Sequence, residues 1–297
     1  MLTQLRCGVV SGRPWVARMA LLAVFPVLLL TACSNTSSSS STSSSSGGGQ
    51  ATTSVLNQVL SRGVLRVAII VPAPGYATVA SNGQYVGYEA DIANLLATDL
   101  GVKIDFIQTD NTGRVTLVQT GKADVAIATF SQTFQRMDVI NFTNPIDIGV
   151  QVLVTSAGNA LTKVSQFNKS GMRIAVATGG TQVQTVSTQL PNATEVQFPS
   201  PDDAIQAVLS GQADAAATGY STVGQYEAAN PGKLQLVSGT LGTPVYNGIG
   251  LVQGDFTWWN YLNYFVNTIN QNGTTCTLWQ KYFGAGTTPG TFAVCPS

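Results

Sequence analysis

Two segments of this chain occur twice with related sequences. Residues 65–70, LRVAII, are echoed by residues 172–177, MRIAVA, and residues 120–128, TGKADVAIA, by residues 210–218, SGQADAAAT. In each copy the second segment follows apolar residues at helical spacing, so each half combines buried strands with a helix and a Gly turn. Two copies this far apart indicate two similar α/β lobes and not a solenoid. Chance similarity is the alternative, because strand–helix–strand units share composition.

The rest of the first half also alternates helices and strands. Residues 89–100 place apolar side chains on one helical face and end at Gly101, and residues 102–106 alternate like a strand. This order predicts a mainly parallel sheet with right-handed crossovers, in which ligands bind beyond the carboxyl ends of the strands. Four such strand ends are expected to meet at one cleft, namely residues 71–76, 128–136, 178–182 and 218–221.

The charge content excludes several classes of function. The sequence has 14 basic and 14 acidic side chains and no histidine. This balance gives no electrostatic footprint for nucleic acid and no polybasic patch for anionic lipid. Without histidine there is no Ser-His or Cys-His nucleophile, and the commonest metal ligand is missing. We therefore expect no nucleic-acid partner, no metal and no cofactor.

The N-terminus has the pattern of a secretion signal. Three arginines precede an uncharged stretch at residues 19–32, which Cys33 follows. This order is typical of a signal peptide over residues 1–33, and the apolar stretch is too short to span a bilayer core of about 30 Å. Residues 30–33, LTAC, resemble the lipobox of bacterial lipoproteins, whose cysteine becomes the lipidated N-terminus. The alternative is ordinary secretion, with Cys33 incidental.

The segment after Cys33 suits an anchored protein. Residues 34–54 are rich in Ser, Thr and Gly, a composition that forms a flexible tether and cannot bury a core. A lipid followed by such a tether attaches a protein to a membrane without spanning it.

Cysteine usage predicts one disulfide. Cys7 leaves with the signal peptide and Cys33 carries lipid, so Cys276 and Cys295 remain in an export compartment where disulfides persist. Their pairing would tie back a C-terminal tail, residues 285–297, and add about 3 kcal/mol on the loop-entropy model. Two free buried thiols are the alternative.

Seven short motifs, taken in order, resemble one protein family. They keep that family's order and approximate spacing across residues 55–284 and lie at residues 63–68, 87–93, 117–124, 133–136, 141–145, 248–251 and 279–284. In this respect the chain resembles the extracytoplasmic solute-binding proteins of amino-acid ABC importers, bacterial family 3.

The resemblance implies an architecture and a function. The implied fold is α/β, a two-lobed periplasmic-binding-protein-like fold of type II with two hinge strands. Lobe one would comprise residues 55–148 and 249–284, and lobe two residues 149–248. The implied protein is a monomer, not an enzyme, that is anchored outside the cytoplasm and delivers a small carboxylate-bearing ligand, an amino acid, to an ABC permease.

The resemblance also implies ligand contacts in lobe one. Arg136 occupies the position that grips the ligand's α-carboxylate, for which a guanidinium fork is well suited. Ser131 stands where a hydroxyl and a backbone N–H meet the same carboxylate, and Thr129 where a backbone carbonyl accepts from the α-amino group. Tyr76 matches the aromatic residue that closes over the ligand. The alternatives are a surface Arg136 paired with Asp138 and a Tyr76 that serves only in the core or at the surface.

In lobe two, Gly180 and Thr181 match a Gly-x-Thr turn at a predicted helix N-terminus, which suits an anionic group. The alternative is a plain Gly-rich turn between a strand and a helix.

Arg114 bears on specificity. Residues 111–115 resemble the Asn-Arg-x-Pro stretch of a branch that includes acidic amino-acid binders, in which this arginine meets a side-chain carboxylate. Two arginines facing one cleft favour a ligand with two acidic groups, because a buried unpaired guanidinium is costly. Alternatively, Arg114 caps its own helix or pairs with Asp110.

Gly219 departs from the family pattern. Family members that bind α-amino acids usually carry an aspartate there, which neutralises the ligand's ammonium. Either another acid such as Glu89 compensates, or the ligand is a dicarboxylate without an α-ammonium.

Two further classes of function occur on this fold: a periplasmic dehydratase of prephenate-like substrates and a ligand-sensing lipoprotein.

Overall fold

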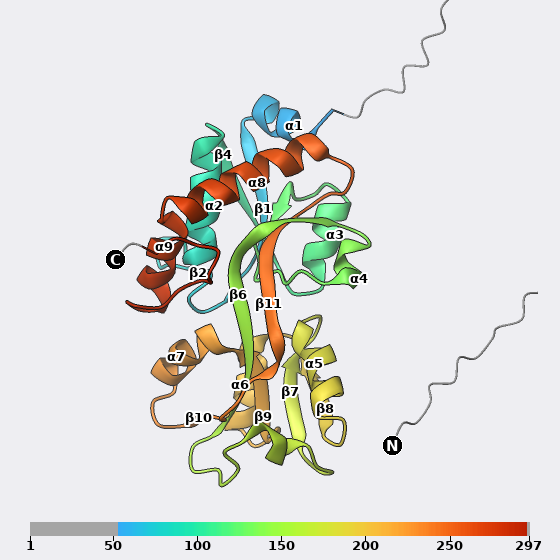
Figure 1. Cartoon of the computed structure of the whole chain (residues 1–297), viewed down its shortest axis with the longest axis vertical. Coiled ribbons are helices and arrows are strands. Elements are labelled where there is room, and N and C mark those ends of the chain that lie inside the picture. Colours follow the sequence, from blue (N-terminus) through green and yellow to red (C-terminus); the bar gives the residue numbers. More distant parts are fainter. Residues whose placement is uncertain (1–52, 296–297) are drawn as a thin grey trace, which may run out of the picture. The chain divides into compact units, whose positions relative to one another are not determined.

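The computed structural model describes residues 53–295. The predicted signal peptide, the lipidation site Cys33 and almost all of the tether therefore lie outside the described residues. Within residues 53–295 the chain forms two α/β lobes joined by two long strands (Figure 1). No helix in this part of the chain is long and apolar enough to cross a membrane.

The first lobe is built on parallel strands, with β1 hydrogen-bonded to both β4 and β5. Its strands are β1 (Val64–Ile70), β4 (Lys103–Thr109) and β5 (Val125–Ala126), and a separate antiparallel pair is formed by β2 (Thr78–Val79) and β3 (Tyr85–Val86). Its helices are α1 (Val55–Arg62), α2 (Tyr88–Asp99), α3 (Gly113–Gln119), α4 (Phe134–Met137), α8 (Phe256–Gln271) and α9 (Thr274–Phe283).

The second lobe repeats this arrangement, with β7 paired in parallel to β8 and β9. Its strands are β7 (Arg173–Ala177), β8 (Thr194–Phe198), β9 (Ala215–Gly219) and β10 (Leu234–Leu236), and its helices are α5 (Thr181–Gln189), α6 (Pro201–Leu209), α7 (Tyr220–Ala229) and the 3₁₀ turn η1 (Val164–Phe167). The echoed sequences are thus β1 and β7, and the segments containing β5 and β9.

Local sequence signals explain several element boundaries. Ser200 caps α6 by accepting a hydrogen bond from the Asp203 N–H at 3.1 Å, and Pro201 occupies the first helical turn. Gly101 follows α2 with a left-handed φ of 67°, as expected for a C-terminal glycine. The residue before α2, Gly87, has to be a glycine, because a Cβ there would lie 2.2 Å from the Tyr76 carbonyl oxygen.

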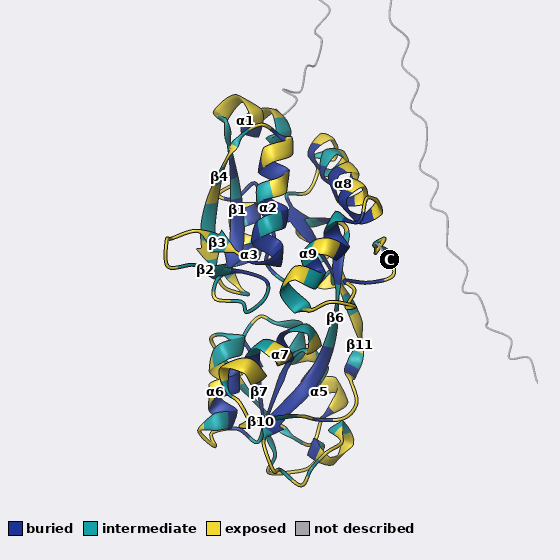
Figure 2. Ribbon diagram, turned by 90° about the vertical axis from the view of Figure 1, so that its left-hand side faces the viewer, coloured by how far each residue is buried: buried dark blue, intermediate teal, exposed yellow. Residues whose placement is uncertain are grey.

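Two antiparallel strands, β6 (Asn141–Ser156) and β11 (Leu241–Leu251), run through both lobes. Ile146 on β6 and Ile249 on β11 belong to the core of the first lobe, whereas Leu153 and Leu241 belong to a core of the second. The expected two-lobed α/β fold with two hinge strands is therefore confirmed. Figure 2 shows the buried strands at the centre of each lobe.

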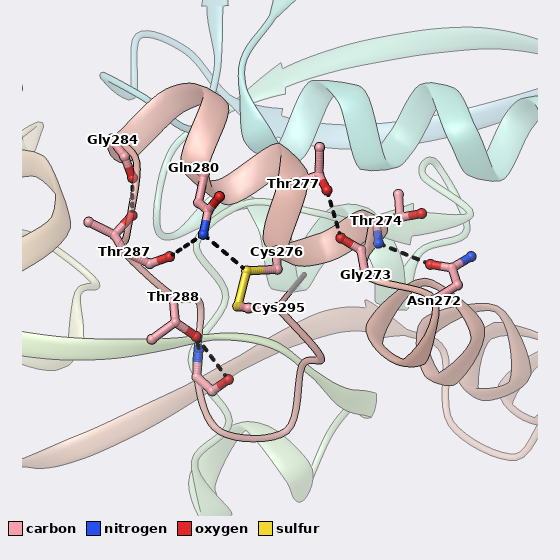
Figure 3. Close-up of a disulfide and its surroundings, with 11 residues drawn as sticks. Asn272, Gly273, Thr274, Cys276, Thr277, Gln280, Gly284, Thr287, Thr288 and Cys295 are labelled. Carbon is pink, nitrogen blue, oxygen red and sulfur yellow. Dashed lines mark hydrogen bonds between the residues drawn. A yellow bond between two sulfur atoms is a disulfide. The ribbon is translucent and has the colours of Figure 1, made fainter. Parts of the chain in front are cut away.

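The predicted disulfide between Cys276 and Cys295 is present (Figure 3). It ties the segment after α9 back onto that helix, where Gln280 Nε2 also donates to the Thr287 carbonyl at 3.2 Å. The same segment reaches a hinge strand, because the Ile148 N–H donates to the Pro289 carbonyl at 2.7 Å. The C-terminal tail is thus fixed at both α9 and β6.

Candidate ligand-binding cleft

A cavity of about 110 Å³ lies between the two lobes. All four segments expected to converge from strand ends contribute to its wall, and so do both hinge strands. Its lining includes Tyr76, Arg114, Thr129, Ser131, Gln151, Gly180, Thr181, Gly219 and Asn247. The volume is below the 300–1,000 Å³ of drug-sized sites and suits a small ligand. Seven of the eight predicted ligand-binding residues line this cavity, and Arg136 does not.

Arg114 lines the cavity and is buried, with 2% of its surface exposed. Its Nη1 donates to the carbonyls of Ala128 and Thr129, and its guanidinium lies 4.4 Å from the centre of the Phe130 ring. Within residues 53–295, its Nε has no hydrogen-bond partner. The Thr129 carbonyl, predicted to accept from a ligand's amino group, therefore already accepts one bond and keeps a second lone pair.

Neither alternative for Arg114 is realised. The start of α3 is held by Asp110, whose Oδ1 accepts from the Thr112 and Gly113 N–H groups at 2.8 and 2.7 Å. The Thr112 hydroxyl donates to the same oxygen at 2.7 Å, and this bond is the largest cause of a lowered Asp110 pKa, followed by that of the Gly113 N–H. Arg114 and Asp110 do not form an ion pair with each other in the described part of the chain.

Arg136 lies beside the cavity at the end of α4 and connects the two lobes. Its Nη1 donates to the Ser131 carbonyl at 2.6 Å and its Nη2 to the Gly179 carbonyl of lobe two at 3.0 Å. The Phe130 ring centre is 5.2 Å from its guanidinium carbon, so one ring is shared by both arginines. No ion pair joins Arg136 to Asp138 in the part of the chain that the structure describes.

Burial disfavours the charge of both guanidinium groups, and Arg136 also disfavours that of Arg114. Burial lowers the Arg136 pKa to about 10. Burial, followed by the charge of Arg136, lowers the Arg114 pKa well below its ordinary value. Because neither arginine has an acidic ion-pair partner within residues 53–295, this end of the cleft is suited to an anion.

Tyr76 lies both at the cavity and in the core of lobe one. Its hydroxyl hydrogen-bonds to the Ser221 hydroxyl of lobe two at 2.9 Å, while its ring packs 4.9 Å from that of Phe283. It therefore lines the cavity, belongs to the core of lobe one and contacts the opposite lobe. Gln225 makes another contact between the lobes, donating to the Tyr282 carbonyl at 3.1 Å.

Gly180 and Thr181 begin α5, as expected. Gly180 is the N-cap and offers no side chain, so the first N–H groups of the helix receive no side-chain cap. The Thr181 hydroxyl accepts from Gln151 Nε2 at 3.1 Å. Uncapped N–H groups at a helix N-terminus favour an anionic ligand.

Gly219 ends β9 and brings no carboxylate to the cavity, and among residues 53–295 no Asp or Glu lines it. Glu89, considered above as a substitute, is fully buried and does not line the cavity. Its Oε1 accepts from the Thr129 N–H. Burial, followed by the nearby Asp147, raises the Glu89 pKa to about 8, and burial raises the Asp147 pKa to about 7.

The sequence reasoning missed the contribution of the hinge strands. Gln151 on β6 and Asn247 on β11 both line the cavity. A polar residue in an otherwise apolar strand, as in the run QVLV at 151–154, was the available signal.

Comparison with known proteins places this architecture in a family. The profile of the bacterial extracellular solute-binding proteins, family 3, matches residues 65–285. The chain belongs to this family. Members are extracytoplasmic solute-binding proteins, and most of them bind amino acids and work with ABC transporters, which confirms the family-level expectation. One relative, 26% identical over 56% of this chain, is a cyclohexadienyl dehydratase of Pseudomonas aeruginosa.

Individual relatives of this family-3 protein differ in the ligands that they are named for. The glutamine-binding protein GlnH of Bacillus subtilis is 24% identical over 68% of this chain and 74% of its own length. The glutamate-binding protein GluB of Corynebacterium glutamicum is 24% identical over 72% of this chain and 77% of its own length. The crystal structure of the ancestral amino acid-binding protein AncCDT-1, a precursor of cyclohexadienyl dehydratase, superposes with a TM-score of 0.72 at 30% identity, covering 77% of this chain and 99% of that one.

Proposed function

We propose that this chain is the lipid-anchored substrate-binding component of an ABC importer and that its ligand is an acidic amino acid of the glutamate or aspartate class. The observation that carries the ligand assignment is the pair Arg114 and Arg136. Both guanidinium groups lie on one ring, that of Phe130, and neither has an acidic ion-pair partner among the described residues.

The surroundings of these arginines leave their charge largely uncompensated. With a pKa of about 8, Glu89 is mostly protonated at neutral pH, so it adds little negative charge beside Arg114. In the part of the chain that the structure describes, no acidic residue lines the cavity. A ligand carboxylate would be stabilised by this positive field, and a cationic side chain would be repelled by it.

Two carboxylates fit this cavity better than one. The first would bind to Ser131, to Arg136 and to the uncapped N-terminus of α5. The second would bind to Arg114 in the cavity wall. In the arrangement described here, the Gly179 carbonyl occupies Nη2 of Arg136. A ligand carboxylate can replace that carbonyl as a stronger, charge-assisted acceptor.

Ligand binding would be transmitted by lobe closure. Hydrogen bonds from Arg136 to Gly179 and between Tyr76 and Ser221 already connect lobe one to lobe two. A ligand that contacts both walls binds the closed state better than the open state and therefore shifts the population towards it. The closed form would then be the one that the permease recognises.

Isothermal titration calorimetry with the mature protein tests the ligand class. We expect glutamate or aspartate to bind with a Kd of about 1 μM and glutamine and arginine to bind at least about tenfold more weakly. Arg114→Met and Arg136→Ala should each abolish detectable binding, whereas Lys122→Met, at an exposed position of lobe one, should not. Tightest binding of a neutral or basic amino acid would refute the acidic assignment.

One alternative ligand is a non-amino dicarboxylate, favoured by Gly219 and by the absence of Asp and Glu from the cavity lining. Glutarate and succinate in the same titrations decide between the two classes. A ligand-sensing lipoprotein would use the same residues, so its test is a pull-down of membrane partners with ligand-loaded protein. Recovery of a receptor without ABC subunits would favour sensing.

A dehydratase is disfavoured by the same lining, because a general acid needs a carboxyl or similar group within reach of the substrate. Incubation with prephenate-like substrates and detection of product would expose such an activity.

A further inference from the structure

An α-amino acid in this cavity needs a partner for its ammonium group. This question rests on the proposed function, because it concerns how the same cavity would hold that ligand. The usual carboxylate position is Gly219, and the cavity lining contains no acidic residue. An ammonium has three donors and no acceptor, so without a carboxylate it requires several neutral oxygens.

Gln151 stands opposite the missing acid. In the antiparallel register of β6 and β9, Gln151 pairs with Gly219. Cross-strand partners hold their side chains about 5 Å apart, so Gln151 can supply a polar group to the region that a side chain at 219 would reach. Gln151 is 3% exposed and its nitrogen is used by Thr181, whereas its amide oxygen has no partner among the described residues.

Asn247 offers a second oxygen from the other hinge strand. It is 5% exposed, and its Nδ2 donates to Asp147 Oδ1 at 2.6 Å. Because this bond uses the amide nitrogen, the amide oxygen is directed away from Asp147 Oδ1. That oxygen is also buried without a partner in the described part of the chain.

Asp147 places a carboxyl group behind Asn247. It is fully buried, and its second oxygen, Oδ2, has no hydrogen-bond partner within residues 53–295. A cation bound to the Asn247 amide oxygen would be separated from the Asp147 carboxyl group only by the Asn247 amide, and negative charge on Asp147 would attract it. Asp147 lies on hinge strand β6 as the cross-strand partner of Asn247. Burial raises its pKa to about 7, so it is partly ionised at neutral pH, and a cation bound nearby would favour its ionised form.

The position of Asn247 also suits the rest of the ligand. Asn247 forms an isolated antiparallel bridge with Ser131, the residue expected to meet the α-carboxylate. The α-carboxylate and α-ammonium of an amino acid are attached to the same carbon, so their binding groups must be neighbours.

We propose that the amide oxygens of Gln151 and Asn247, the latter oriented by the buried Asp147, form the ammonium-binding site of this protein. The site lies on the two hinge strands in place of the lobe-two carboxylate. It selects α-amino acids over their deamino analogues.

Paired ligands that differ only in the amino group test this site. The probes are L-glutamate with glutarate, L-glutamine with glutaric acid monoamide, and L-arginine with 5-guanidinopentanoate, titrated into wild type and into Gln151→Leu, Asn247→Leu and Asp147→Asn. We expect wild type to favour the amino acid of the best-binding pair and each variant to reduce that preference by about tenfold, because a hydrogen bond to a charged group is lost. Affinity for the deamino partner should be unchanged, and Gln235→Leu on β10 should behave like wild type.

The outcomes separate this site from the ligand class proposed above. If the glutamine or arginine pair binds best but the variants lose the amino preference, the acidic assignment fails and the ammonium site stands. If the variants weaken both members of a pair equally, or leave the amino preference intact, the ammonium site is refuted. Equal binding of both members of every pair by wild type refutes it as well.

Discussion

The carboxylate of Asp124 accepts hydrogen bonds from both the backbone N–H and the guanidinium of Arg66. The N–H bond is 2.8 Å to Oδ2 and the guanidinium bond is 2.7 Å to Oδ1. In lobe two, Arg173 makes the same two kinds of bond to Asp214, at 2.8 and 3.0 Å. Each pair links the start of one echoed strand to the residue before the other. The internal similarity of the sequence thus preserves a specific contact as well as a pattern of apolar residues.

The two carboxylates should differ in their contribution to stability. The Asp124 side chain is 2% exposed and also binds Arg62, whereas that of Asp214 is 28% exposed. We therefore expect Asp124→Asn to lower the free energy of unfolding by about 3 kcal/mol, and Asp214→Asn by less than about 1 kcal/mol. Urea denaturation of the mature protein measures both. Equal losses would show that burial does not distinguish the pairs.

Much of the fold could be predicted from the sequence because its signals are local. The echoed runs combine continuous apolar strands with Gly turns, and they form β1, β7 and the segments that contain β5 and β9. The disulfide followed from counting cysteines. The bond from Ile148 to Pro289 could not be predicted, because it depends on where the tail lies against β6.

The site was less predictable, because its contacts depend on how closely the lobes approach. The sequence located Arg136 but not its bond to the Gly179 carbonyl, which exists only when the lobes meet. The positions of Gln151 and Asn247 in the cavity wall could not be predicted, because the side chains of the hinge strands do not simply alternate between a buried and an exposed face. Their ligand-binding role remains a prediction.

Gly179 should limit how tightly the lobes close. Its φ is +71°, and a Cβ at this position would lie 2.8 Å from Thr112 Cγ2 in lobe one. Gly179→Ala should therefore weaken ligand binding about tenfold or more by opposing closure. Calorimetry gives the affinity, and small-angle scattering with saturating ligand shows whether the protein still becomes more compact.

The matched control is Gly158→Ala. Gly158 has a similar φ of +78°, but a Cβ there would have no atom within 4 Å. It carries the same backbone strain without the contact between lobes. If both variants weaken binding equally, local strain and not lobe approach is responsible.

Glu89 should make stability depend on pH. Its pKa rises from 4.5 to about 8 on folding, so the folded state retains a proton that the unfolded state releases. The stabilisation is complete below about pH 4.5 and is lost as the pH rises through 8, at no more than about 1.4 kcal/mol per pH unit. The Tm should fall between pH 5 and pH 8.5. In Glu89→Gln, which keeps an acceptor for the Thr129 N–H, that fall should shrink, and an unchanged pH profile would contradict the assignment.

The disulfide should stabilise the C-terminal tail. Cys276 and Cys295 are 19 residues apart, a loop whose closure is worth about 3 kcal/mol on the loop-entropy model. Cys276→Ala with Cys295→Ala, or reduction of wild type, should therefore lower the Tm by several degrees. Differential scanning calorimetry with and without dithiothreitol measures this. A reductant-dependent shift in the double variant would indicate an effect other than loss of this bond.

Cys33 should decide where the protein is found in the cell. Residues 30–33 resemble a lipobox, and a segment rich in Ser and Gly follows them, a composition typical of flexible linkers. We expect wild type to incorporate a fatty-acid analogue and to sediment with membranes, because stable anchoring follows from more than one acyl chain. Cys33→Ala should take up no label. It should be released or held as an uncleaved precursor, and the size of the product on a gel separates these two states. Labelling of Cys33→Ala, or a soluble and unlabelled wild type, would show that the cysteine is incidental and that the protein is secreted free.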